Sequence, residues 1–158
     1  MATLRRATPA DAAALTRLRG VMHEAMGDAT SEVWRVGCEQ AFARRLATDS
    51  FIAFVVEEDG VVVATGAGWL EEHLPSPYMV DARRGYIASM STDPAYRRRG
   101  LGRQVLEALM AWFVDQGVLR VDLRATPEGL PLYDGFGFRR LGGASMSWTA
   151  SGTRVGMP

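Results

Sequence analysis

The residues best suited to bind a ligand lie in one short segment, Arg97 to Arg103, which holds four arginines and two glycines. It follows a predicted strand and precedes a predicted helix. Gly100 and Gly102 leave the backbone bare at the first helical turn, where unpaired N–H groups and the helix dipole attract anions. Arginines add charge and bidentate hydrogen bonds to phosphate oxygens. The segment predicts a phosphate or pyrophosphate site, with a solvated basic loop as the alternative.

The chain has no lysine, since all 18 basic residues are arginines, and this excludes sites that depend on a lysine side chain. A P-loop lysine, a Schiff-base lysine and a kinase-type lysine are therefore excluded. The dinucleotide-binding fingerprint is excluded too, because position 105 holds a valine rather than a third glycine. The single Cys38 and the two histidines, His23 and His73, argue against a metal site.

Hydrophobic patterning predicts one α/β domain that positions this segment. The chain has 158 residues and 47% of them are apolar, which suits a single domain with a real core. Apolar residues at helical spacing, and β-rich runs, mark the elements. The expected helices cover residues 8–19, 31–48, 100–116 and, as a short turn or helix, 129–134. The expected strands cover residues 4–7, 51–56, 61–70, 85–92, 118–124 and 138–149. The crossover from 85 to 124 suits parallel pairing, while the other connections favour antiparallel pairing.

Charge and hydropathy exclude several classes of partner. The 18 basic residues are balanced by 18 acidic ones, which disfavours nucleic-acid binding through the arginines. No signal peptide is visible at the N-terminus, and the longest apolar run, Ala108 to Val114, falls short of the ~20 residues that span a bilayer. The expected location is cytoplasmic, without membrane contact.

Two motifs together resemble those of the GNAT superfamily of acyl-CoA N-acyltransferases. The first is the family's motif A, Arg/Gln-x-x-Gly-x-Gly/Ala, matched here by Arg97-x-x-Gly100-x-Gly102 after the lead-in Asp93-Pro94-x-Tyr96. The second is Leu-Tyr-x-x-x-Gly-Phe, matched by residues 132–138. The opening at residues 7–11 is also similar, so the resemblance covers most of the chain.

The resemblance implies a single-domain GNAT fold over residues 1–150, followed by a flexible tail at residues 151–158. In this α/β fold the sheet is mixed and mostly antiparallel. It is splayed between two parallel strands and flanked by helices on both faces. Such a fold implies acetyl-CoA as co-substrate, and the cysteine and histidine content predicts no metal.

The resemblance also implies which residues hold the co-substrate. In the family, the pyrophosphate rests on backbone N–H groups of motif A, and the pantetheine arm follows the bulged strand before it. Thr126 stands where many members carry an asparagine that touches the pantetheine, so its contact is uncertain. Carried over, the cofactor-binding residues are Met90, Ser91, Thr92, Arg97, Arg98, Arg99, Gly100, Leu101, Gly102, Arg103 and Thr126.

The catalytic residue implied by the resemblance is Tyr133, as a general acid toward the leaving thiolate. A phenol with a pKa near 10 is not strongly driven to protonate a thiolate whose thiol has a pKa near 8.5, so positioning must contribute. The backbone N–H of Met90 is expected to polarise the thioester carbonyl. An aromatic residue that merely packs the cleft is the alternative for Tyr133.

The general base stays unassigned. Glu71, Glu72 and His73 lie at a strand end, and Ser89 or Ser91 could instead hold a water that relays the proton. For Glu71 and Glu72 a solvated surface role is the simpler interpretation, and for His73 a role in the loop.

The expected activity is acetyl transfer from acetyl-CoA to a primary amine, by direct attack in a ternary complex. A small molecule is favoured over a peptide or protein amine, and a non-catalytic acyl-CoA-binding domain is a further alternative. The loop from Glu71 to Arg83 carries Glu72, Asp81 and Tyr78, which favours a cationic or amphipathic amine. A homodimer is possible.

Overall fold

The computed structural model describes residues 1–152 and shows five strands and four α-helices there. The strands are β1 (Thr3–Arg6), β2 (Phe51–Glu58), β3 (Val61–Glu72), β4 (Arg83–Thr92) and β5 (Val121–Leu123). The α-helices are α1 (Ala12–Ala25), α2 (Glu32–Leu46), α3 (Leu101–Asp115) and α4 (Leu130–Phe136). Short 3-10 helices, η1 (Pro9–Asp11) and η2 (Pro94–Tyr96), precede α1 and α3.

The strands form one sheet in the order β1-β2-β3-β4-β5. The first three pairings are antiparallel, and only β4 and β5 run parallel, as expected for the crossover that contains α3. This parallel pairing is short: it runs from Gly85 opposite Val121 to Ile87 opposite Leu123. Beyond Ile87, no strand of the described chain pairs with β4 on that side. The predicted mixed, splayed sheet is thus confirmed.

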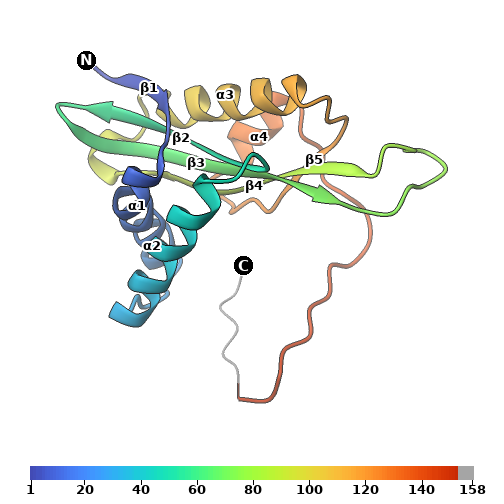
Figure 1. Ribbon diagram of the computed structural model, residues 1–158, viewed down its shortest axis with the longest axis horizontal. Helices are drawn as coiled ribbons and strands as arrows, with labels where there is room; N and C mark the ends of the chain where they lie inside the picture. Colours follow the sequence, from blue (N-terminus) through green and yellow to red (C-terminus); the bar gives the residue numbers. More distant parts are fainter. Residues whose placement is uncertain (153–158) are drawn as a thin grey trace. The chain divides into compact units, whose positions relative to one another are not determined.

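Helices cover both faces of the sheet, as Figure 1 shows: α1 and α2 lie on one face and α3 lies on the other. Helix α1 packs on β3 and β4, and α2 packs on β2, whereas α3 packs across β2, β3 and β4. The predicted apolar stripe of α3 is buried. It consists of Leu101, Val105, Leu109 and Phe113.

Three glycines let α3 approach the sheet closely. A Cβ at Gly85 would lie 2.5 Å from Cε1 of Phe113, and one at Gly68 would lie 2.9 Å from Cζ of the same ring. A Cβ at Gly66 would lie 2.8 Å from Cγ1 of Val105. Non-bonded carbon atoms do not approach one another this closely, so any larger residue at these positions would push α3 away from the sheet.

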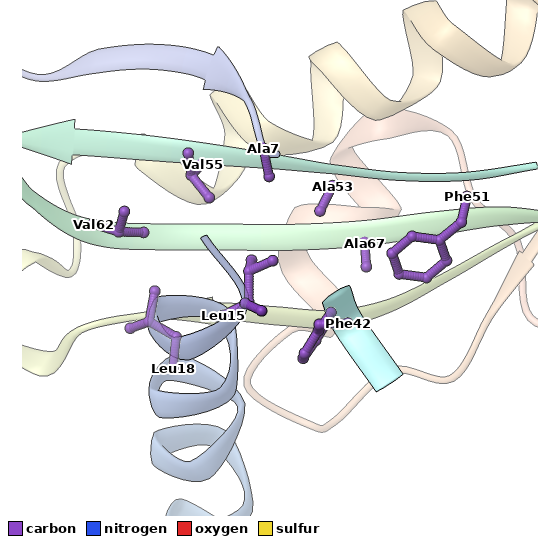
Figure 2. Close-up of a cluster of buried hydrophobic side chains, with 10 residues drawn as sticks. Ala7, Leu15, Leu18, Phe42, Phe51, Ala53, Val55, Val62 and Ala67 are labelled. Carbon is purple, nitrogen blue, oxygen red and sulfur yellow. The ribbon is translucent and has the colours of Figure 1, made fainter. Parts of the chain in front are cut away.

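The opposite face holds a cluster of buried apolar side chains from α1, α2, β2 and β3 (Figure 2). Leu15 and Leu18 of α1 are almost wholly buried there. Phe42 of α2 lies near Phe51 of β2, with the rings edge to face and their centroids 6.4 Å apart. Burial on this face therefore fixes both helices against the sheet.

Helix caps and tight turns form at residues whose types favour them. Ser31 caps α2, its Oγ accepting a hydrogen bond from the N–H of Trp34 at 3.1 Å. Asp59 and Gly60 have φ values of 52° and 78°, the paired left-handed conformation of a tight hairpin turn. Gly117, with φ of 73°, follows α3 as expected of a helix stop.

Two strand predictions are wrong in part or in whole. Residues 138–149 form no strand, and residues 118–124 contribute only Val121–Leu123. The first segment includes Gly143 at φ 92° and is exposed from Arg139 onward, so its alternating polar and apolar residues have no face to bury. In the second, Leu119 is 74% exposed and lies outside the ladder.

By its internal contacts, the chain divides into two compact units, Met1–Leu123 and Arg124–Pro158. The first contains the sheet, α1, α2 and α3. The second contains α4 and an exposed segment, described as far as Gly152. The predicted tail at residues 151–158 lies mostly outside the described residues. Within residues 1–152, no helix is long and apolar enough to cross a membrane.

Candidate active site

Strand β4 contains a β-bulge at the point where its partner on the β5 side is lost. The pairs that flank it are Thr65 with Ser91 and Ala67 with Ala88, so Ser89 and Met90 stand opposite the single residue Gly66. Ser89 has φ of 58°, a left-handed conformation that a residue with a side chain adopts only under constraint. Such strained residues concentrate at functional sites. This bulge is the one that the family resemblance predicts.

The bulge directs neighbouring side chains to different faces of the sheet. The sulfur of Met90 occupies the space that a side chain at position 66 would need, beside α3. Ser89 instead lies on the side of α1 and α2, where its hydroxyl is buried. Met90 and Ser89, although consecutive, thus place their side chains on opposite faces of the sheet.

Helix α1 holds β4 next to the bulge through two polar contacts. The Ser91 hydroxyl donates to the Leu18 carbonyl at 2.7 Å. A guanidinium nitrogen of Arg17 lies 3.2 Å from the carboxylate of Asp93, which directly follows β4. The Ser91 hydroxyl proton is therefore engaged, and of the two serines considered as proton relays only Ser89 remains open.

Motif A forms the junction between β4 and α3 and presents a row of free amide groups. Gly100 has φ of 78° and is the residue before the helix, and its carbonyl accepts the first helical hydrogen bond, from Gln104 N–H at 3.1 Å. Within residues 1–152 no protein acceptor satisfies the N–H groups that precede that bond. They belong to Arg98, Arg99, Gly100, Leu101, Gly102 and Arg103. This N-terminus suits an anion.

Three of the four motif arginines already contact the protein, and one does not. The contacts join Arg97 Nε to the Thr92 carbonyl at 3.2 Å, Arg99 to Glu58 at 2.9 Å and Arg103 to Glu107 at 3.0 Å. The guanidinium of Arg99 also lies over the Tyr96 ring. Arg98 has φ of 61° and pairs with no side chain of the described residues. Among the four, the structure leaves Arg98 most available for a phosphate.

Tyr133 lies on α4 in the second unit and is 8% exposed. Its ring meets Phe138 edge to face, with centroids 5.8 Å apart. Burial raises the pKa of Tyr133 to about 12, so the phenol is protonated at neutral pH. That is the form a general acid needs, and the assignment itself stays a prediction.

Thr126, predicted to contact the cofactor, has a structural contact in the second unit. Its Oγ1 accepts a hydrogen bond from the N–H of Gly129 at 3.2 Å, at the turn that starts α4. A Cβ at Gly129 would lie 3.1 Å from the Tyr133 ring. The glycine therefore lets that ring pack against the turn.

A cavity of about 170 Å³ lies on the α1/α2 side of the sheet and reaches the bulge. Its walls come from α1, α2, β2, β3 and β4. The residues that line it include Arg19, Phe42, Arg45, Phe51, Trp69 and Ser89. This cavity is not predictable from the sequence, because its residues are scattered over five elements and share no spacing.

The acidic residues named in the sequence analysis do not line this cavity. The carboxylate of Glu71 lies 3.0 Å from the indole nitrogen of Trp69 and 3.0 Å from Nε2 of His73. Asp81 accepts a hydrogen bond from the N–H of Arg83 at 2.9 Å. The carboxylates of Glu71 and Asp81 therefore form hydrogen bonds with residues close to them in the sequence. Within residues 1–152, no cluster of histidine, cysteine or acidic residues could hold a metal ion.

The profile of the acetyltransferase (GNAT) family matches residues 19–138, a span that includes the bulge, motif A and Tyr133. The chain belongs to this family. An uncharacterized protein of Mycobacterium leprae is 36% identical over 67 residues, which are 42% of this chain and 18% of that protein. The chain thus matches less than a fifth of the length of this curated relative.

Two solved structures share the GNAT fold with this chain. A GCN5-related N-acetyltransferase from Ralstonia eutropha is 27% identical, with a TM-score of 0.81, and the match covers 96% of this chain and 100% of that one. A predicted acetyltransferase from Clostridium acetobutylicum, solved with acetyl-CoA, is 23% identical with a TM-score of 0.81 and 95% of both chains covered. The predicted GNAT fold is confirmed.

Proposed function

We propose that this GNAT protein transfers the acetyl group of acetyl-CoA to a primary amine of a small molecule, in a ternary complex. One observation carries the proposal. The open edge of β4, at Ser89 and Met90, leads directly to the free amide groups at the start of α3. A long ligand with an anionic end and hydrogen-bonding groups along its arm would fit that arrangement.

The residues of this junction suit acetyl-CoA. The free N–H groups from Arg98 to Arg103 would hold the pyrophosphate, with the unpaired guanidinium of Arg98 beside it. Past Ile87, the main chain of Met90, Ser91 and Thr92 has no strand partner on one side among residues 1–152, and it would accept the pantetheine arm. Bound there, acetyl-CoA would supply an activated acetyl thioester.

Two groups of this chain would then act on the transfer. The N–H of Met90 would stabilise negative charge on the carbonyl oxygen as the amine nitrogen forms the new C–N bond and the C–S bond breaks. Tyr133 would give its proton to the departing sulfur and regain one from solvent. Because its pKa is about 12, this transfer is uphill in the resting protein, so its position must compensate. The attacking amine would lose its own proton to a water held at Ser89.

A thiol-release assay tests the activity. The protein is mixed with acetyl-CoA and a panel of amines, amino acids and short peptides, and free thiol and acetylated product are both measured. We expect thiol and product in equal amounts with at least one small amine, and little thiol without an acceptor. Tight binding of acetyl-CoA without product from any acceptor would indicate an acyl-CoA-binding domain instead.

A further inference from the structure

The cavity beside the bulge carries two arginines and no acid to balance them. Arg19 of α1 and Arg45 of α2 both line it, and neither pairs with a carboxylate of the described residues. None of the residues that line it within the described chain is acidic. A negatively charged group of a ligand in this cavity would find two cations to pair with.

Arg45 is held in place by aromatic rings rather than by an ion pair. The carbon of its guanidinium lies 4.5 Å from the centroid of the Phe51 ring and 4.6 Å from that of Trp69. Those two rings stack on each other, with an interplanar angle of 15°. Contact with ring faces leaves the in-plane N–H groups of a guanidinium free, which is the geometry that binds a carboxylate with two parallel hydrogen bonds.

Glu71 forms no ion pair with Arg45. Glu71 acts on it from a distance, but both carboxylate oxygens of Glu71 are occupied by Trp69 and His73. Burial lowers the pKa of Arg45 from its usual value, and the neighbouring charge of Arg44 adds to this effect. Arg45 is therefore a partly desolvated cation with no ion pair among residues 1–152.

A second, independent observation points to a ligand in this cavity. The hydroxyl of Ser89 is buried, the residue is only 6% exposed, and no group of the described chain forms a hydrogen bond with it. Buried polar groups are normally satisfied, so this hydroxyl is a place for a polar atom of a ligand. It belongs to the bulge, where the amine must meet the thioester.

The remaining walls are apolar and set the size of the ligand. Phe42, Phe51 and Ala67 lie at the same end of the buried cluster (Figure 2) and contribute to the walls. A cavity of about 170 Å³ is close to the size that holds one benzene-sized group. The rest of a longer sugar or peptide chain would have to lie outside this space.

From this arrangement we infer that the acceptor is a small amino acid-like amine, with a free carboxylate bound by Arg19 and Arg45, an apolar group of about one ring against Phe42, Phe51 and Trp69, and its amine next to Ser89. This inference rests on the proposed function, and it replaces the cationic amine favoured by the sequence of the loop. It also separates free amino acids from peptide amines, because a peptide has lost the carboxylate next to its N-terminal amine.

The test compares L-phenylalanine with L-phenylalaninamide, which has the same ring and amine but no negative charge. Binding of each is measured by calorimetry on the intact protein saturated with coenzyme A, and acetylation of each is measured by thiol release. We expect phenylalanine to bind about 10- to 100-fold more tightly than the amide, as for loss of charge-assisted hydrogen bonds. Equal or tighter binding of the amide would overturn the inference.

Variants show whether the arginines cause the preference. Arg45→Met and Arg19→Met keep an apolar stem and remove the charge, and each should reduce the preference for phenylalanine at least 10-fold. Arg44→Met, on the exposed side of the same helix, is the matched control and should leave it unchanged. Unchanged acetyl-CoA affinity checks that each variant is folded. A preference that survives loss of both cavity arginines would also overturn the inference.

The two proposals fail in different ways. Arginine-dependent binding of phenylalanine without acetylation would support the acceptor site and contradict the transferase activity. Acetylation of the amide at a higher rate than the amino acid would support the activity and contradict the anionic acceptor.

Discussion

The Ser91 hydroxyl donates a hydrogen bond to the Leu18 carbonyl at 2.7 Å, and it thereby fastens α1 to β4 just past the bulge. Ser91→Ala removes that donor from a partly buried site. We expect the free energy of unfolding to fall by about 1 kcal/mol, measured by urea denaturation. Ser147→Ala, at an exposed position, should change it little. Equal stability of the two variants would show that this bond does not hold the helix.

Gly102→Glu should weaken binding of acetyl-CoA more than 10-fold. The substitution puts a side chain and a negative charge at the start of α3, where the free amide groups would hold the pyrophosphate. Calorimetry on the folded variant measures the affinity. Gly142→Glu makes the same change of charge at an exposed position and should bind as the natural protein does. Unchanged affinity in Gly102→Glu would remove motif A from the binding site.

Tyr133→Phe keeps the ring and removes the proton. If Tyr133 is the general acid, kcat should fall by roughly 10²- to 10⁴-fold, while acetyl-CoA affinity stays nearly the same. Single-turnover measurements with an amine that the unchanged protein acetylates ensure that the chemical step is observed. Full activity under those conditions would mean that the residue only packs the cleft.

The pKa of Tyr133 also predicts how stability depends on pH. Because folding raises this pKa from 10 to about 12, the folded state holds the proton more tightly than the unfolded state. Its contribution is fully present below pH 10 and is lost as the pH rises from 10 to about 12. The loss should approach about 2–3 kcal/mol. Denaturation curves at several pH values, compared with those of Tyr133→Phe, measure it; identical pH dependence would contradict it.

Gly85→Ala should displace α3 from the sheet. The added Cβ would lie 2.5 Å from the Phe113 ring in a packed core, and we expect a loss of about 1–3 kcal/mol in unfolding free energy. At Gly37, an exposed helix position with no neighbour within 4 Å, the same substitution should raise stability by about 0.5–1 kcal/mol. Thermal denaturation of both variants shows whether the two effects have opposite signs.

Features that depend on local order were predictable from the sequence. The stripe from Leu101 to Phe113 predicts a buried helix face, because its spacing alone decides which side chains share that face. The turn at Asp59 and Gly60 and the cap at Ser31 follow from single side chains or short pairs. Motif A was found for the same reason, since its amide groups are consecutive in the chain.

The acceptor cavity was not predictable, because it depends on residues that meet only in the folded chain. In the sequence Arg44 and Arg45 are an equivalent pair on a helix. Only the packing of Phe51 and Trp69 around one of them makes it different. The wrong strand at residues 138–149 has a related cause. Alternation favours a strand, but a strand forms only where a neighbouring edge pairs with it.

The bulge in β4 depends on the number of residues in this strand, because two of them stand opposite one residue of β3. A gene that lost the single codon for Ser89 would encode a β4 that could pair with β3 without interruption. The left-handed residue and the unsatisfied hydroxyl would both be gone, so we expect the shortened protein to be the more stable one. It would also have lost the bulge that places Ser89 on one face of the sheet and Met90 on the other. Selection on folding alone would favour that deletion, and only selection on activity would preserve the extra residue.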